Sequence, residues 1–481
     1  MTQPVASHAK RIYPCCVVIL AAGKGTRMRS EHAKVLHPLC GRPMILYPVE
    51  TAMALEPEKI LVVIGYEADQ VKEALQEYPV EFVLQEEQKG TGHAVIQAIA
   101  ALQDFEGNVV ILYGDSPLLA ADELRALIHE RERTGTALAL LIARMQPPTG
   151  YGRIIRSGSQ IERIVEERDA TPEEKKIDEV NPGIYCFDAA ALKKALAKLN
   201  NKNAQGEYYL TDTFEVLRKM GYKAVALTSL RPETLWGVNT RVELAETERK
   251  IWLRRARQFM LQGVSILHPE TFFASHETKI GRDTVIYPNV IIEGATEIGQ
   301  KVTIFPNTRI IDSRIGAEAQ ILDSCVITES EVGPGTTVGP FAHLRAHATV
   351  GAGCRIGNFV EVKNSHVGDK SKAAHLTYLG DAEIGKDVNI GAGTITCNYD
   401  GVAKNPTYIG DGAFIGSDSQ LIAPVRVGEG AYVAAGSSIT EDIPPYSLGI
   451  ARGRQVNKEG WVKDKKARKR SKTDLGAEPP E

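Results

Sequence analysis

A six-residue repeat of aliphatic and small side chains runs from Ile280 to Ile439. Each repeat begins with an aliphatic residue, usually has a small residue next, and has a small or β-branched residue three positions after the first. An example is Ile298-Gly-Gln-Lys-Val-Thr. This period predicts a parallel β-helix, in which each short strand points its aliphatic side chain inward and three repeats close one triangular coil. A β-sandwich would instead need two-residue alternation with turns about every eight to twelve residues.

The chain before this repeat alternates short apolar runs with amphipathic stretches. That alternation is typical of an α/β domain with a Rossmann-like, mostly parallel sheet. The expected strands are 16–21, 59–64, 81–84, 108–113, 137–143 and 183–187, and the expected helices include 43–55 and 68–77.

A charged segment separates the two patterns. Residues 242–262 are apolar at helical spacing and contain no glycine or proline, so they predict a linker helix. We therefore expect an α/β domain at 1–241, this linker, an all-β domain at 263–457 and a tail at 458–481. The tail is basic and polar, and we expect it to be disordered.

Length and charge narrow the function classes. A chain of 481 residues is too long for one domain. With 57 basic and 60 acidic residues the net charge is −3, so we expect small-molecule partners, no nucleic acid and no membrane. The seven cysteines are odd in number and scattered without a Cys-x-x-Cys pair, which argues against disulfides or zinc and favours a reducing cytoplasm.

The N-terminus imitates a signal peptide, because Lys10-Arg11 precedes the apolar run 12–22. We reject that interpretation, since the run contains Pro14 and leads directly into a glycine loop with a chemical use of its own. No run in the chain approaches the roughly eighteen apolar residues of a membrane helix.

That loop, Ala21-Ala-Gly-Lys-Gly-Thr-Arg-Met28, follows the first expected strand. Open α/β sheets bind nucleotides at the carboxyl ends of such strands, and glycines let backbone N–H groups approach phosphate oxygens. Lys24, Arg27 and Lys34 would add mobile positive charge. The loop is neither a Walker A motif nor a complete dinucleotide fingerprint, and alone it is equally compatible with a plain strand-turn-helix.

Two further loops leave expected strands. Tyr113-Gly-Asp115-Ser-Pro117 places a carboxylate after a buried strand, where it could bind Mg²⁺ beside a nucleoside triphosphate or merely cap a turn. Gln85-Glu-Glu-Gln-Lys-Gly-Thr-Gly-His93 is a polar glycine-rich turn after another strand. Chance placement of all three loops is a poor explanation.

These loops, with Lys34-Val-Leu, resemble the sugar-nucleotide pyrophosphorylase signature. Followed by hexapeptide repeats, the chain resembles the bacterial bifunctional N-acetylglucosamine-1-phosphate uridyltransferase/glucosamine-1-phosphate acetyltransferase family over residues 14 to 462. The resemblance implies a left-handed β-helix, a homotrimer, and synthesis of UDP-N-acetylglucosamine for peptidoglycan and lipopolysaccharide.

The resemblance also implies site residues for uridylyl transfer. The uracil, ribose and phosphate site would comprise Leu20, Ala22, Gly23, Lys34, Gln85, Gly90, Thr91 and Tyr113. The sugar phosphate would meet Gly152, Glu166 and Asn181, and Mg²⁺ would bind Asp115 and Asn239. The sugar phosphate attacks the α-phosphorus of UTP, so Arg27 and Lys34 need only balance charge and no protein nucleophile is required.

The hexad pattern fails at 363–383 and 396–407, where we expect loops carrying a second site. Acetyl transfer to an amine needs a base, and His375 is the candidate, although a loop histidine is more often a plain surface residue. The resemblance implies that glucosamine-1-phosphate would meet Arg345, Lys363, Tyr378 and Asn389. Acetyl-CoA would meet Ala392, Asn398, Tyr399, Ser417, Ala435 and Arg452.

One stretch departs from the family pattern, in which proline and glycine commonly follow the arginine. Arg345 is followed here by Ala346-His347-Ala348, so we expect a changed local turn with the chemistry retained. Two other functions stay open. One is transfer to a different sugar and nucleotide, such as glucose-1-phosphate and dTTP. The other is a sugar-1-phosphate nucleotidyltransferase whose β-helix is a non-catalytic oligomerisation module.

Overall fold

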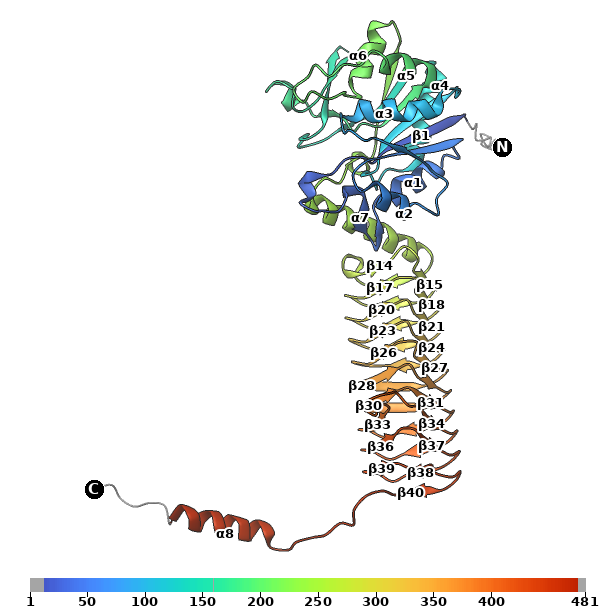
Figure 1. Ribbon diagram of the computed structural model, residues 1–481, viewed down its shortest axis with the longest axis vertical. Coiled ribbons are helices and arrows are strands. Elements are labelled where there is room, and N and C mark those ends of the chain that lie inside the picture. Colours follow the sequence, from blue (N-terminus) through green and yellow to red (C-terminus); the bar gives the residue numbers. More distant parts are fainter. Residues whose placement is uncertain (1–12, 159, 475–481) are drawn as a thin grey trace, which may run out of the picture. The chain divides into compact units, whose positions relative to one another are not determined.

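The computed structural model describes residues 13–158 and 160–474. The chain divides into two compact units (Figure 1). The first extends to Gln258 and includes Phe272–His276, and the second comprises Phe259–Thr271 and the residues from Glu277 onward.

The first unit is built on a ten-stranded mixed sheet. Its strand order is β5-β4-β1-β6-β11-β7-β10-β8-β9, with β12 beside β7. The strands β5, β4, β1 and β6 are parallel, whereas β11 is antiparallel to both β6 and β7. Their bounds are β1 Cys15–Leu20, β4 Lys59–Ile64, β5 Glu81–Leu84, β6 Asn108–Tyr113, β7 Leu138–Arg144, β8 Gly152–Ser157, β9 Gln160–Val165, β10 Glu179–Asn181, β11 Tyr185–Asp188 and β12 Ala224–Thr228.

Helices cover both faces of this sheet. Every residue of β1 is buried, and its alternate side chains enter two different apolar clusters, Val17 and Ile19 in one and Cys16, Val18 and Leu20 in the other. The covering helices are α1 Leu46–Met53, α2 Ala68–Ala74, α3 Thr91–Ile99, α4 Ala121–Thr134, α5 Ala189–Leu196 and α6 Asp212–Lys219. The last four were not assigned from sequence, and neither were β8, β9, β10 and β12.

The helix α7, Arg241–Leu261, matches the expected linker helix within one residue. It begins with a capping box, in which Glu243 accepts the backbone N–H of Thr240 at 2.9 Å and Thr240 Oγ1 accepts that of Glu243 at 3.2 Å. Leu244 and Ile251 enter an apolar cluster of the first unit with Met28. As far as Gln258, α7 is therefore part of the first unit's core.

The second unit is the parallel β-helix that the hexads predict, with the left-handed form that the family resemblance implies (Figure 1). Equivalent strands are 17 or 18 residues apart, close to three hexads. One face is β15 Lys279–Ile280, β18 Glu297–Ile298, β21 Arg314–Ile315, β24 Glu331–Val332, β27 Thr349–Val350, β29 His366–Val367, β31 Ala382–Ile384, β34 Thr407–Ile409 and β37 Val425–Val427.

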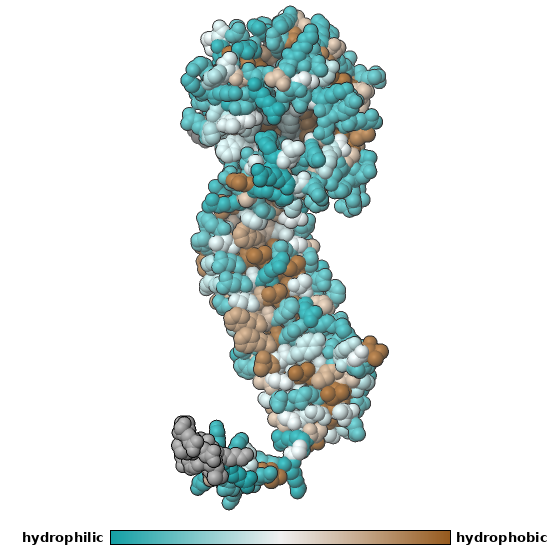
Figure 2. All heavy atoms as spheres, turned by 60° about the vertical axis from the view of Figure 1, so that its left-hand side comes forward, coloured by the Kyte–Doolittle hydropathy of each residue, from teal (hydrophilic) through white to brown (hydrophobic). Residues whose placement is uncertain are grey.

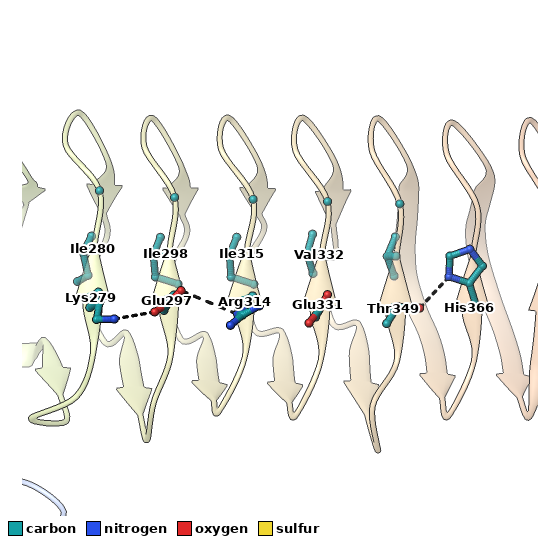
Figure 3. A pocket seen from close by; sticks show the side chains of 16 residues that line it. Lys279, Ile280, Glu297, Ile298, Arg314, Ile315, Glu331, Val332, Thr349 and His366 are labelled. Atoms are coloured by element: carbon teal, nitrogen blue, oxygen red, sulfur yellow. Dashed lines mark hydrogen bonds and ion pairs between the residues drawn. The ribbon is translucent and has the colours of Figure 1, made fainter.

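Each coil on this face follows the same rule. Figure 3 shows an inward stack of aliphatic side chains that includes Ile280, Ile298 and Ile315, beside a row of polar ones. In that row Lys279 Nζ lies 2.8 Å from a Glu297 carboxylate oxygen. A glycine follows each aliphatic residue, and at Gly281 a Cβ would lie 2.6 Å from backbone atoms of the next coil. Small residues recur here because the coils approach too closely for a side chain.

The other two faces alternate along one long sheet. From β16 onward its strands are β16 Val285–Ile286, β17 Ile291–Glu293, β19 Thr303–Ile304, β20 Arg309–Ile311, β22 Gln320–Ile321, β23 Val326–Thr328, β25 Thr337–Val338, β26 His343–Arg345, β28 Arg355–Lys363, β30 Lys372–Gly380, β32 Asn389–Ile390, β33 Ile395–Cys397, β35 Phe414–Ile415, β36 Gln420–Ile422, β38 Tyr432–Val433, β39 Ser438–Ile439 and β40 Leu448–Gly449. Figure 2 shows apolar side chains along the surface of this unit, and the exposed ones include Phe341, Phe359 and Leu376.

The first expected loop, at 363–383, is wrong. That stretch contains β29, β30 and the start of β31, and β30 pairs with β28 over its whole length. The hexad is lost but Ala373, Thr377 and Leu379 still point inward, so the coil closes without a loop. The second expected loop is present at 398–406, between β33 and β34, and stretches one coil to 25 residues.

The tail was expected to be disordered, but in its described part Trp461–Asp474 forms the helix α8. The segment has no glycine or proline and is rich in lysine and arginine, which are good helix formers. Residues 475–481 lie outside the described residues. No helix in residues 13–158 and 160–474 is both long and apolar enough to cross a membrane.

Two candidate active sites

The first unit contains a cleft of about 500 Å³ at the carboxyl ends of β1 and β6. Leu20 and Tyr113, the last residues of those strands, line it. The residues that the resemblance implies for uridylyl transfer all line this one cleft, namely Leu20, Ala22, Gly23, Arg27, Lys34, Gln85, Gly90, Thr91, Tyr113, Asp115, Gly152, Glu166, Asn181 and Asn239. Lys24, which was also expected to supply positive charge, does not line it, and its ammonium lies 5.1 Å from the centroid of the Tyr66 ring.

The charged groups of the cleft form one cluster. Lys34 Nζ forms an ion pair with the Asp115 carboxylate and donates a hydrogen bond of 3.0 Å to Asn239 Oδ1. Arg27 donates to the same Asn239 oxygen at 2.8 Å. A Cβ at Gly25 would lie 2.5 Å from Lys34 Cβ, and Gly25 has a φ of 68°, so glycine is needed there to seat Lys34.

The oxygens of this cluster suit a hard cation. Asp115 and Asn239 both direct oxygen atoms at one positive charge, the Lys34 ammonium. Within the described residues there is no group of three His, Cys, Asp or Glu side chains that could hold a metal by itself. Mg²⁺ commonly takes one or two protein oxygens and completes its shell with substrate phosphates and water, so the donor set fits it.

Asn239 is positioned by residues that sequence reasoning missed. The backbone N–H of Asn239 donates to the Glu243 carboxylate at 2.6 Å. Two residues earlier, the backbone N–H of Gly237 donates to the Tyr151 hydroxyl at 3.1 Å. Val238 donates to the Asp115 carbonyl at 2.8 Å. The Thr-x-x-Glu capping signature was visible in the sequence and could have pointed to Glu243.

A second end of the cleft is formed by the 85–91 loop. Gln85 Nε2 lies 3.2 Å from the Gly90 carbonyl and 3.0 Å from His93 Nδ1, which fixes the side-chain amide. Gly90 has a φ of 100°, and a Cβ there would lie 2.7 Å from the Tyr208 carbonyl. Gln88, also not predicted, donates to the Ala22 carbonyl at 2.7 Å and ties this loop to the first glycine loop.

The remaining end of the cleft is acidic and enclosed. Glu166 accepts a hydrogen bond of 2.9 Å from Thr211, another residue that sequence reasoning missed. Burial raises the pKa of the Glu166 carboxyl, and the charge of Asp212 adds to the effect. Asn181 donates to the Tyr185 hydroxyl at 2.5 Å and accepts the Gly183 N–H at 3.2 Å, so its orientation is fixed.

In the β-helix, several predicted residues surround a carboxylate that was not predicted, Asp381. Lys363 Nζ lies 3.5 Å from Asp381, and Asn398 donates to it. Asn398 also lies 3.5 Å from the Tyr378 hydroxyl. Although burial opposes the effect, hydrogen bonds from Asn364 and Asn398 lower the pKa of Asp381. The structure therefore holds a cation and two hydrogen-bonding side chains against a fixed anion.

A second set follows one edge of the solenoid. His375 is in register with Asn358 on the preceding coil. The backbone bonds Asp418 N–H to Ala392 at 2.7 Å and Gly436 N–H to Ser417 at 2.8 Å continue the same edge, and Arg452 donates to the Ala435 carbonyl at 2.7 Å. The histidine and four residues predicted for acetyl-CoA thus occupy successive coils of one edge.

The other predicted residues lie nearby in the fold. Arg345 is in register with Lys363 and donates to Glu361 at 2.7 Å. Tyr399 lies exposed in the 398–406 loop. Asn389 is in register with Lys372. Among the described residues, no hydrogen bond joins Asn389 or His375 to the Asp381 group.

The turn after Arg345 contains two left-handed residues. Ala346 and His347 have φ values of 51° and 62°, so two consecutive residues with a Cβ adopt the left-handed conformation. That conformation costs an L-residue about 1 kcal/mol. The turn begins directly after β26, which ends at Arg345. The expectation of a changed local turn with the chemistry retained stays a prediction.

Known proteins resemble both units. Residues 16–236 match the nucleotidyl transferase family, and residues 329–364 and 406–441 match the bacterial transferase hexapeptide family of six repeats. A bifunctional protein GlmU from Geobacillus sp. (strain WCH70) is 49% identical over 446 residues, covering 92% of this chain and 97% of its own length.

Two further relatives carry the same name. The protein from Shouchella clausii is 48% identical, with 93% of this chain and 98% of its own length covered. The protein from Carboxydothermus hydrogenoformans is 49% identical, with 93% and 99% covered. Identity of this extent spans both the cleft and the solenoid edge. The chain belongs to the bifunctional GlmU family.

Proposed function

We propose that this chain acetylates glucosamine-1-phosphate with acetyl-CoA in the β-helix and then transfers UMP from UTP to the resulting N-acetylglucosamine-1-phosphate in the cleft. The observation that carries the proposal is the near full-length identity to bifunctional relatives, together with a charged cleft in one unit and a histidine-bearing edge in the other. The product would be UDP-N-acetylglucosamine, a precursor of peptidoglycan and lipopolysaccharide.

In uridylyl transfer, a phosphate oxygen of the sugar attacks the α-phosphorus of UTP and pyrophosphate leaves. Arg27 and Lys34 neutralise the charge that develops on the phosphates. Asp115 and Asn239 would hold Mg²⁺, which when bound supplies further positive charge at the reacting phosphates. The cleft residues mainly orient the two anionic substrates, which is the main need of phosphoryl transfer.

Substrate choice would lie at the two ends of the cleft. The Gln85 amide nitrogen is held by its contacts to Gly90 and His93, which use both of its N–H donors. The fixed amide therefore offers its carbonyl oxygen as an acceptor to the edge of uracil. Glu166 accepts hydrogen bonds from sugar hydroxyls, and Thr211 keeps that carboxylate in place. The Gln85 loop and the Glu166 and Asn181 pair favour UTP with an N-acetylamino sugar.

In acetyl transfer, the amine nitrogen of glucosamine-1-phosphate attacks the thioester carbonyl carbon. The carbon–sulfur bond breaks and its electrons leave with the CoA sulfur. His375 takes the amine proton and returns it to the thiolate. Lys363 and Arg345 would meet the sugar phosphate, and the edge from Ala392 to Arg452 would hold acetyl-CoA.

Assembly and location complete the proposal. Hexapeptide repeats support oligomerisation, and we expect a homotrimer because three parallel solenoids would cover the apolar faces that carry Phe341 and Phe359. We expect the enzyme to act in the cytoplasm.

The test supplies glucosamine-1-phosphate with acetyl-CoA and UTP, separately and together. We expect CoA release with acetyl-CoA alone and pyrophosphate release only when both are present. UDP-sugar formation without any acetylation would instead make the β-helix a non-catalytic module, and turnover of glucose-1-phosphate with dTTP would overturn the substrate assignment.

A further inference from the structure

The contact between Asn358 and His375 carries an inference about the acetyl-transfer site. The Asn358 Oδ1 atom lies 2.9 Å from His375 Nδ1. A carbonyl oxygen can only accept a hydrogen bond, so Nδ1 must carry the proton. In the neutral imidazole the other nitrogen, Nε2, then has the free lone pair. The contact therefore fixes both the tautomer and the rotation of the ring.

Backbone geometry holds the two side chains together. The strands β28 and β30 pair in parallel with Asn358 and His375 in register. Just before them, a Cβ at Gly357 would lie 1.8 Å from the Ala374 carbonyl oxygen, so only glycine allows the coils to approach this closely. Just after them, Phe359 and Leu376 have φ values of 57° and 38°. Two residues with a Cβ therefore adopt a strained backbone conformation at the point where Asn358 and His375 are in register.

The rest of the surroundings leave this role to Asn358. The residues of the next coil at this edge, Gly391, Ala392 and Gly393, have no titratable side chain. The charged or titratable groups on the paired strands are Arg355, Lys363, Glu361, Lys372 and Tyr378. Within the described residues, none of these forms a hydrogen bond with the imidazole. His375 itself is exposed, so its ring would be free to rotate without the amide.

We propose that Asn358 is a positioning residue for acetyl transfer, which holds His375 as the Nδ1–H tautomer with Nε2 directed to the substrate amine. The inference rests on the proposed role of His375 as the base. It assigns to Asn358 the part that a buried carboxylate plays for many catalytic histidines, but with a neutral acceptor.

The experiment compares Asn358→Ala and Asn358→Asp in the full-length enzyme. Asn358→Ala removes the acceptor, so kcat for acetyl transfer should fall about tenfold or more, while KM for both substrates stays within about twofold. Asn358→Asp keeps an acceptor and adds a negative charge. It should restore kcat, and the acidic limb of its pH–rate profile should move upward by about one pH unit.

Controls separate positioning from stability. Asn307→Ala, in an earlier coil where Asn307 accepts a hydrogen bond from Asn289, should leave both activities unchanged. Uridylyl transfer serves as the folding check for every variant. In a His375→Ala background, Asn358→Ala should have no further effect on acetyl transfer, since the residue acts through the ring.

Two outcomes overturn the inference while sparing the proposed function: unchanged kcat in Asn358→Ala, or an equal loss in the His375→Ala background. If His375→Ala itself retains acetyl transfer, the proposed function of that site fails first. The nitrogen chemical shifts of the His375 ring provide an independent readout, because a protonated Nε2 in the free enzyme would contradict the assigned tautomer.

Discussion

In the proposed function, the cleft and the solenoid edge both place side chains around anionic substrates. They do so in opposite ways. The cleft gathers residues as distant in sequence as Arg27 and Asn239, whose side chains are 2.8 Å apart, into one enclosed volume. The edge sets residues on successive coils, one coil apart, on an open surface. In the cleft each residue depends on many elements, whereas on the edge each depends on its own coil and the two beside it.

This difference predicts how far the effect of a substitution extends in each site. A change in the cleft should reach several partners at once, because Lys34, Asp115 and Asn239 share their contacts. A change on the edge should stay within adjacent coils. The five predictions that follow probe this contrast, beginning with the largest effect.

The cleft should fail completely when its central carboxylate is removed. Asp115→Ala deletes a proposed Mg²⁺ oxygen and leaves Lys34 without its partner, so uridylyl transfer should fall by about 10³-fold or more. Acetyl transfer should be nearly unchanged. Both rates are measured in one preparation, with the exposed Asp104→Ala as the matched control. Loss of both activities in a folded variant, or normal uridylyl transfer at limiting Mg²⁺, would contradict the assignment.

The solenoid edge should lose acetyl transfer when the His375 imidazole alone is removed. His375→Ala should lower acetyl transfer by about two to four orders of magnitude, as expected of a lost general base, and leave uridylyl transfer unchanged. Because the base must be neutral to act, the wild-type rate should fall on acidification. Rates are measured against pH at saturating acetyl-CoA. A variant that keeps more than about a third of the rate would make His375 a structural residue.

Truncation tests where the first unit ends. A fragment ending at Arg241 loses Glu243, Leu244 and Ile251, and the two apolar side chains alone contribute about 3 to 6 kcal/mol of burial. A fragment ending at His276 keeps all three. We expect the longer fragment to be a stable, monomeric uridylyltransferase and the shorter one to unfold at a lower temperature. Equal melting temperatures would place the boundary at 241, and a trimeric long fragment would show that the β-helix is not needed for assembly.

A smaller effect is expected at the enclosed end of the cleft. Glu166→Gln should raise KM for N-acetylglucosamine-1-phosphate about tenfold by weakening a charged hydrogen bond. Burial raises the pKa of Glu166, so the folded state favours the protonated carboxyl and its contribution to stability falls as pH rises above about 4, the unfolded value. The variant should therefore melt at a higher temperature than wild type at pH 8, and the gap should close near pH 4. A gap that is constant with pH would disprove this account.

The smallest effect is expected at the turn after Arg345. Ala346→Gly relieves a left-handed alanine and should stabilise the β-helix by up to about 1 kcal/mol, after allowing for the extra freedom of glycine in the unfolded chain. Ala348→Gly, at a buried position without positive φ, should destabilise it. Thermal unfolding of the two variants is compared with wild type. The same sign for both would mean that the turn is not strained.

The strands of the two units could also be predicted from the sequence to different extents. The strands β4, β5 and β6 have the expected bounds, because each is a continuous apolar run between polar turns. The strands β8 and β9 were missed, since charged residues interrupt their apolar positions and leave no such run. The strand β12 was overlooked, although Ala-Val-Ala-Leu is an apolar run. In the β-helix the six-residue period predicted the coils correctly. The prediction failed only where a loop was expected and β30, residues 372–380, is present, because inward residues remain there but their spacing is not a hexad.

The candidate sites followed the same division. The predicted cleft residues share one cleft because loops after parallel strands meet at one sheet edge, which sequence position alone allows one to infer. Thr211 and Tyr151 approach from distant segments, so nothing in a single sequence links them to Glu166 or Gly237. Asp381 and Asn358 were missed because coil register, and not local sequence, places them beside Lys363 and His375.

The coils stack regularly at the His375 edge, so the distance between two residues on this edge is set by the number of coils between them. In this sense the edge acts as a molecular ruler. Neighbouring parallel strands lie about 4.8 Å apart, so the four steps from His375 to Arg452 span about 19 Å. A donor that touches both residues must lie extended, with its reactive end at a fixed distance from its far end. Removing one whole coil between them would shorten the ruler without unfolding the solenoid, and would select for a shorter donor.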